Sequence, residues 1–150
     1  MKYKHSKRID IVSLKMVKEK SIFYGNRSIS SVNDAVELLK GFFYEADREM
    51  LLVCCLNTKN EPNCINTVSI GTLTSSLVHP REVFKASIMS NSASIILAHN
   101  HPSGNSIPSE EDLKITRRIK EAGEILGIRL LDHIIIGDNN YKSLKERGVI

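Results

Sequence analysis

Short apolar runs alternate along this chain with segments in which apolar residues recur every three or four positions. Continuous apolar runs are typical of strands buried on both faces, whereas the 3.6-residue period is typical of amphipathic helices. We expect strands at 50–58, 65–72, 93–99 and 128–137, and helices at 30–43, 79–91 and 108–126. The resulting order of elements predicts an α/β fold in which a mixed β-sheet is flanked by helices in layers.

Positive charge is concentrated at the N-terminus. Residues 1–20 hold seven Lys or Arg against Asp10 and Glu19, a net charge of +5, so the other 130 residues sum to −1 within the overall +4. We therefore divide the chain into a basic N-terminal arm or edge strand at 1–29 and a domain at 30–150. A solvated arm is the simpler interpretation. An arm that binds phosphates is the alternative, which leaves DNA as a less favoured partner.

Length and apolar content indicate a single globular domain of 150 residues. The longest apolar runs fall short of the ~20 residues that span a bilayer. The N-terminus also lacks the apolar core of a secretory signal. We therefore expect a cytoplasmic protein with no membrane partner. Cys54, Cys55 and Cys64 form no C-x-x-C pair and are expected to stay reduced, with Cys54 and Cys55 packed inside a strand.

Two histidines stand one residue apart where an apolar run ends, in the stretch LAHNHPSG. Side chains of a strand alternate between its faces, so His99 and His101 point the same way. Pro102 and Gly104 suit a tight turn directly after them. A pair of imidazoles on one side can bind a divalent metal, and a pair that simply faces solvent is the alternative.

The next helix is expected to begin beside these histidines. Pro108 discourages helix before it, which makes Ser109 a natural N-cap and places Asp112 at the third helical position. Ser109 and Asp112 alone are typical of a capping box. Because a cap does not explain two aligned imidazoles, the combination favours a metal site formed by His99, His101 and Asp112. Three protein ligands leave a fourth position for water, as in catalytic zinc sites.

A hydrolytic zinc site also requires a carboxylate that is not a ligand and that can move a proton. Glu45, Glu49 and Glu82 are candidates, and Glu49 is favoured because it stands where a buried strand is expected to begin. His79, just before Pro80, is expected at a turn or helix start, and His5 lies in the arm.

The spacing of four residues resembles a known motif. His99-x-His101, seven residues, Ser109, two residues and Asp112 match the JAMM (MPN+) metalloprotease motif. The segments at 71–116 and 130–148 are more closely similar to the bacterial RadC family. The resemblance covers about residues 30 to 150 and implies a JAB1/MPN fold, similar to that of cytidine deaminases.

The same resemblance assigns roles. It implies zinc on His99, His101 and Asp112. Ser109 would help to hold an oxyanion, and the family's acidic residue at the head of the first core strand falls on Glu49. His133 aligns with a family Asp-His pair, and we expect it to be a buried residue behind the ligands and not a fourth ligand.

The chain departs from the family pattern in two places. Asn100 stands where deubiquitinating relatives usually have Ser or Thr, which argues against a ubiquitin-like substrate. We also expect no helix-hairpin-helix DNA-binding region of the kind that full-length RadC proteins carry, because the segment before residue 30 is too short for one. The leading hypothesis is a zinc hydrolase that cleaves a peptide or isopeptide bond in a peptide or protein substrate. The alternative is a DNA-associated RadC-like module linked to DNA repair or recombination, in which the metal site is vestigial or acts on nucleic acid. Zinc that only stabilises the fold is a third interpretation.

Overall fold

A computed structural model describes residues 6–150. Its elements follow one another in the order expected from the sequence, with one short 3-10 helix and one short C-terminal strand in addition. The elements are α1 (Val32–Leu39), η1 (Lys40–Phe43), β1 (Met50–Leu56), β2 (Pro62–Ile70), α2 (Pro80–Met89), β3 (Ser94–Asn100), α3 (Glu110–Leu126), β4 (Arg129–Ile136) and β5 (Tyr141–Ser143).

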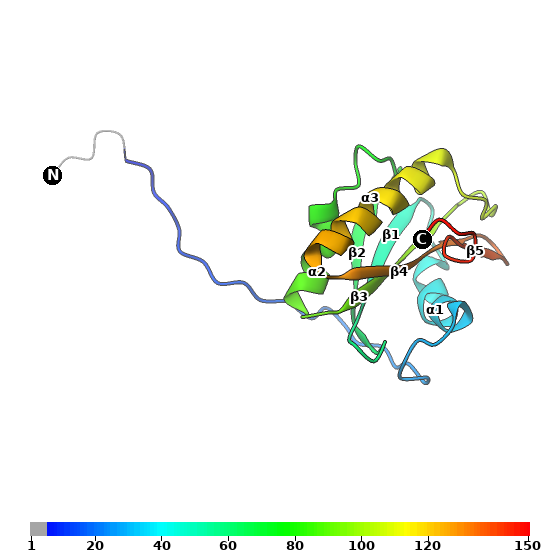
Figure 1. The fold of residues 1–150 in the computed structure, drawn as a ribbon, viewed down its shortest axis with the longest axis horizontal. Coiled ribbons are helices and arrows are strands. Elements are labelled where there is room, and N and C mark those ends of the chain that lie inside the picture. Colours follow the sequence, from blue (N-terminus) through cyan, green and yellow to red (C-terminus); the bar gives the residue numbers. More distant parts are fainter. Residues whose placement is uncertain (1–5) are drawn as a thin grey trace.

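The five strands form one sheet in the order β2-β1-β3-β4-β5. Only β3 and β4 run parallel, and α3 makes the crossover between them, while the other neighbours pair in the antiparallel sense (Figure 1). This arrangement confirms the mixed sheet. The strand β5 was not predicted, because its three residues contain no apolar run.

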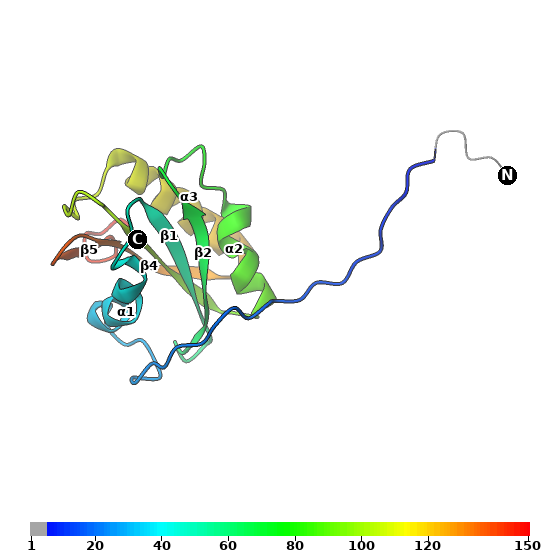
Figure 2. The ribbon, with the colours of Figure 1, turned by 180° about the vertical axis from the view of Figure 1, so that it is seen from behind.

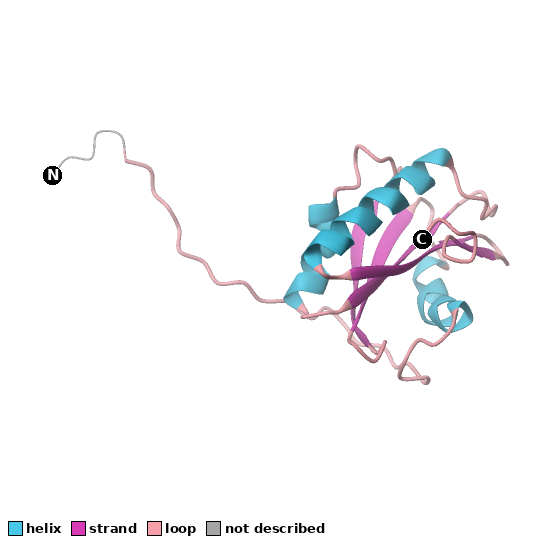
Figure 3. Cartoon of the chain, in the orientation of Figure 1, coloured by secondary structure: helices cyan, strands magenta, loops and turns pink. Residues whose placement is uncertain are grey.

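Helices cover both faces of the sheet, as Figure 3 shows. Alternate residues of β1 divide between two cores: Leu51 and Val53 pack toward α2 and α3, whereas Leu52 and Cys54 pack toward α1. Burial on both faces is why the strand is apolar at every position. Cys54 and Cys55 are buried free thiols, as expected.

The N-terminal segment contains neither helix nor strand between residues 6 and 24, and it extends away from the sheet in Figures 1 and 2. The first buried residue of the chain's described part is Ile29, at 8% exposure. The boundary that we place near this residue stays a prediction. Among residues 6–150, no helix is both long and apolar enough to cross a membrane.

A tight turn brings α3 back to the end of β3. The Gly104 amide donates to the His101 carbonyl over 2.9 Å, which closes the turn. Gly104 has a φ of 85°, and a Cβ at this position would collide with the Asp138 carboxylate. Glycine is therefore favoured here by conformation, and a larger residue would also displace the exposed Asp138 side chain. The carboxyl end of β3 and the N-terminus of α3 consequently lie next to each other.

Candidate metal centre

His99 and His101 project from the carboxyl end of β3. His99 pairs with Leu51 on one side and Ile135 on the other, and its ring is fully buried. The His101 amide donates to the Ile136 carbonyl over 3.0 Å, which continues the pairing with β4 by one residue. The ring centroids of the two histidines lie 5.0 Å apart. The alternation of a strand thus places both imidazoles on one side, as expected.

Asp112 reaches the same point from the first turn of α3. A capping box is present: the Asp112 amide donates to Ser109 Oγ over 3.1 Å, and the Ser109 amide donates to Asp112 Oδ2 over 2.8 Å. The same carboxylate also faces both imidazoles, with Oδ1 at 3.2 Å from His99 Nε2 and Oδ2 at 3.2 Å from His101 Nε2. Capping and ligation are therefore compatible roles of one side chain.

The three side chains together form a group that could hold a metal ion. Their ligand atoms lie within 4.8 Å of one another. Asp112 is 3% exposed. The pKa of its carboxyl group is lowered from the usual value: burial acts to raise this pKa, and the hydrogen bonds from Ser109 act to lower it. The carboxylate is therefore anionic at neutral pH, as a metal ligand must be.

The hydrogen bonding of His101 tests whether these residues fit a metal. Its Nδ1 lies 2.7 Å from the Asn105 carbonyl oxygen. A carbonyl only accepts, so the proton of the neutral ring is on Nδ1 and the lone pair on Nε2 points at Asp112. A lone pair and a carboxylate oxygen 3.2 Å apart share no proton. A cation between them relieves their repulsion, and the residues therefore fit a divalent metal.

Ser109 lies at the rim of this group. Its side chain is exposed, and its Oγ accepts the Asp112 amide proton in the cap. A hydroxyl that accepts in the cap keeps its own proton for another acceptor. Ser109 can therefore donate to a substrate oxygen near the ligands without giving up its capping role.

Glu49 immediately precedes β1, beside the histidines. The antiparallel register that pairs Leu51 with His99 brings Glu49 opposite His101 when it is continued by two residues. The side chains of Glu49 and Leu51 then share a face, because they are two positions apart. In the structure the Glu49 carboxylate accepts the Leu73 amide over 2.9 Å.

The other two candidate carboxylates have different surroundings. Glu82 forms an ion pair of 2.9 Å with Lys85 on α2, where both side chains are largely exposed. Glu45 lies in the loop between η1 and β1. We therefore keep Glu49 as the predicted proton carrier.

Asn100 is a residue whose structural role the sequence analysis missed. Its side chain accepts the Met50 amide over 2.7 Å and donates to the Arg48 carbonyl over 3.1 Å. The two hydrogen bonds bracket Glu49 and fix the segment that carries it next to His101. No local sequence pattern predicts this contact, because the partners are about 50 positions apart in the chain.

The remaining histidines occupy the expected places where the structure describes them. His133 is 1% exposed, and its Nε2 lies 2.7 Å from His99 Nδ1, so it stands behind a predicted ligand. Burial lowers the pKa of His133 well below its usual value, which keeps this ring neutral. His79 is the N-cap residue of α2. His5 falls outside the described residues.

A hollow of about 110 Å³ opens at the carboxyl ends of β3 and β4, and its lining includes Phe43, Asn100 and Ile136 besides His101. Phe43 and Ile136 belong to the core on the α1 side of the sheet. Neither His99 nor Asp112 lines the hollow, so it is not part of the predicted metal site.

Comparison with known proteins identifies the family. The sequence matches the family described as RadC-like JAB domain over residues 29–149. A UPF0758 protein of Clostridium beijerinckii is 57% identical over 122 residues, which cover 81% of this chain and 53% of that relative. A UPF0758 protein of Rubrobacter xylanophilus is 53% identical over 126 residues, or 84% of this chain and 55% of that relative.

The chain spans about half the length of the curated relatives it matches. The family match nevertheless includes every strand and helix of the sheet domain, together with the three predicted ligands. The mixed sheet with helices on both faces agrees with a JAB/MPN domain. The chain therefore belongs to the RadC-like JAB domain family.

Proposed function

We propose that this chain is a zinc-dependent hydrolase of the JAMM type that cleaves a peptide or isopeptide bond. The observation that carries the proposal is that two imidazoles and one buried carboxylate meet where the carboxyl end of β3 lies next to the N-terminus of α3. Two nitrogen ligands and one oxygen ligand are a common donor set for catalytic zinc. The family match supports a hydrolytic site of this kind.

Each residue has one task in the proposed reaction. His99, His101 and Asp112 hold the metal. When bound, zinc supplies Lewis-acid chemistry, which polarises a carbonyl oxygen and acidifies water. Glu49 takes the proton from the attacking water and delivers it to the leaving amine. Ser109 donates its free hydroxyl proton to the oxygen on which negative charge develops.

The substrate approaches from the side of His101 and Ser109, because these members of the site are accessible to solvent. The opposite side of the site is closed by the core, because His99 and His133 are buried. A peptide or protein segment that reaches the site from solvent is therefore the proposed substrate, and a cytoplasmic location stays a prediction.

Replacement of the proposed proton carrier tests this function. Glu49→Gln keeps the shape of the side chain but cannot accept a proton, so the zinc-loaded variant is expected to lose about 100-fold or more in hydrolysis. Glu82→Gln is the matched control, since Glu82 pairs with Lys85 on the surface. The probes are an internally quenched peptide library and lysine isopeptides. A Glu49→Gln variant that hydrolyses them as fast as wild type contradicts the assignment.

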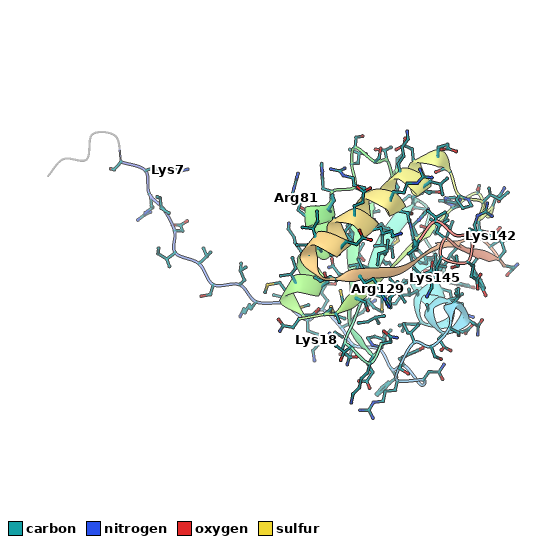
Figure 4. All side chains as sticks on the ribbon, in the orientation of Figure 1. Lys7, Lys18, Arg81, Arg129, Lys142 and Lys145 are labelled. Carbon is teal, nitrogen blue, oxygen red and sulfur yellow. The ribbon has the colours of Figure 1, made fainter. Side chains whose placement is uncertain are left out.

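A DNA-associated role is the second candidate, and the charge of the N-terminal segment supports it. In Figure 4, Lys7 lies on the part of this segment that extends from the domain, and Lys18 lies where the segment meets the domain. Deletion of residues 1–20 is expected to flatten the slope of log affinity for DNA against log salt. Absence of binding by the complete chain near physiological salt contradicts this role.

A further inference from the structure

A buried chain of polar groups extends from His99 into the core. His99 Nδ1 lies 2.7 Å from His133 Nε2, and His133 Nδ1 lies 2.6 Å from Thr116 Oγ1. The Thr116 hydroxyl in turn donates to the Asp112 backbone carbonyl over 2.7 Å. His99, Thr116 and His133 are each at most 1% exposed, so water does not complete any of these bonds. The chain thus starts on one predicted metal ligand and ends on another.

The direction of these hydrogen bonds determines where the proton of His99 resides. A neutral imidazole carries one proton and offers one lone pair. A metal on His99 Nε2 requires the proton on Nδ1, so His133 Nε2 must accept it. The proton of His133 is then on Nδ1, and Thr116 must accept it and pass its own hydroxyl proton to the Asp112 carbonyl. The distances of all three links fit this arrangement, and the direction of the last one is fixed because a carbonyl only accepts.

The opposite direction is incompatible with a metal. If Thr116 donated to His133 Nδ1, the proton of His133 would be on Nε2 and would point at His99 Nδ1. The proton of His99 would then occupy Nε2, which faces Asp112 Oδ1 at 3.2 Å. A protonated nitrogen has no lone pair for a cation. The Asp112 carbonyl, which is the last acceptor in this series of hydrogen bonds, therefore determines whether His99 can bind a metal.

We propose that Thr116 and His133 are positioning residues that fix His99 in the Nδ1-protonated form, with the Asp112 carbonyl as the final acceptor. The proposal rests on the metal site described above. Neither residue contacts the substrate side of the site, since both are buried behind His99. They raise the affinity for the metal by fixing the tautomer of the His99 ring.

Two substitutions at position 116 test the relay. Thr116→Val has nearly the same shape but no hydroxyl, whereas Thr116→Ser keeps the hydroxyl. Zinc affinity is measured by competition with a chromophoric chelator, and Thr116→Val is expected to bind zinc about 10- to 100-fold more weakly while Thr116→Ser stays near wild type. Long-range ¹H–¹⁵N spectra of the zinc-free proteins report the tautomers directly. We expect Nδ1–H at His99 and His133 in wild type and the Ser variant, and its loss at His133 in the Val variant.

A second pair of variants covers the case in which Thr116→Val does not fold. The amide oxygen of His133→Gln can accept from His99 Nδ1, whereas His133→Leu offers no acceptor, so the Gln variant is expected to bind zinc more tightly. Urea unfolding with chelator present reports the folding of each variant. Equal zinc affinity within both pairs, with unchanged tautomers, overturns the relay alone. A wild-type chain that binds no zinc overturns the metal site and the relay together.

Discussion

Asp112 has two roles, as the N3 residue of the capping box of α3 and as the third predicted ligand, and two substitutions separate them. Asp112→Asn keeps an oxygen that can accept the Ser109 amide proton but removes the negative charge, whereas Asp112→Ala removes both. Loss of a capping hydrogen bond costs about 0.5–2 kcal/mol of unfolding free energy. For a chain of this length that loss lowers the Tm by about 1–8 °C. Without metal, the Ala variant is therefore expected to melt below wild type and the Asn variant much less so.

Zinc is expected to stabilise wild type alone. At a free zinc concentration 100 times the dissociation constant, binding adds about 2.7 kcal/mol. This gain raises the Tm by about 5–11 °C. Both Asp112 variants should lose this rise, because each lacks the anionic ligand. Calorimetry with chelator and with buffered zinc measures both effects in one series. If Asp112→Asn rises with zinc as much as wild type, Asp112 is not a ligand and the reasoning fails.

Asn100→Ala is expected to slow hydrolysis by about 100-fold while zinc content stays near wild type, because the segment that carries Glu49 loses its two hydrogen bonds to Asn100. Zinc content and hydrolysis rate are measured on one sample. An unchanged rate contradicts the role of Asn100 in positioning Glu49. Among the thiols, the hydrogen bond from Cys55 lowers the pKa of Cys64 to about 6, whereas burial raises that of Cys54 to about 12. Iodoacetamide is therefore expected to label Cys64 first at pH 7, where its thiolate predominates. Labelling of Cys64 that begins only above pH 8 would refute this.

Much of the sheet domain was predictable because its strands are buried on both faces. β1 is apolar at every position and β3 is apolar from Ile95 to Ala98, and the structure places helices on either side of them. Helix starts were predictable from local chemistry, since Ser31 and Ser109 both cap helices with their side chains. The strand β5 escaped prediction because Tyr141–Ser143 is held by pairing with β4 and not by a pattern of its own.

In the predicted site, too, local spacing predicts some features and misses the contacts between distant residues. The spacing of His99 and His101 on one strand, and of Ser109 and Asp112 on one helix, contains the geometry that brings the three ligands together. Contacts that depend on the register between strands have no local sequence pattern, so they could not be predicted.

Thr116 could have been placed on the same face as Asp112 from their spacing of four residues. Its partner His133 comes from β4, and only the parallel pairing of β3 with β4 brings that ring behind His99. The link between Asn100 and the segment around Glu49 likewise depends on the pairing of β1 with β3.

X-ray absorption spectroscopy at the zinc edge of the zinc-loaded chain tests the central claim most directly, because it reports the atoms that surround the metal. Two imidazoles and one carboxylate predict only nitrogen and oxygen neighbours, at about 2.0–2.2 Å, with the multiple-scattering pattern of two rings. One of the two rings should disappear in His101→Ala. A sulfur neighbour at about 2.3 Å would instead assign the metal to the cysteines and contradict the account.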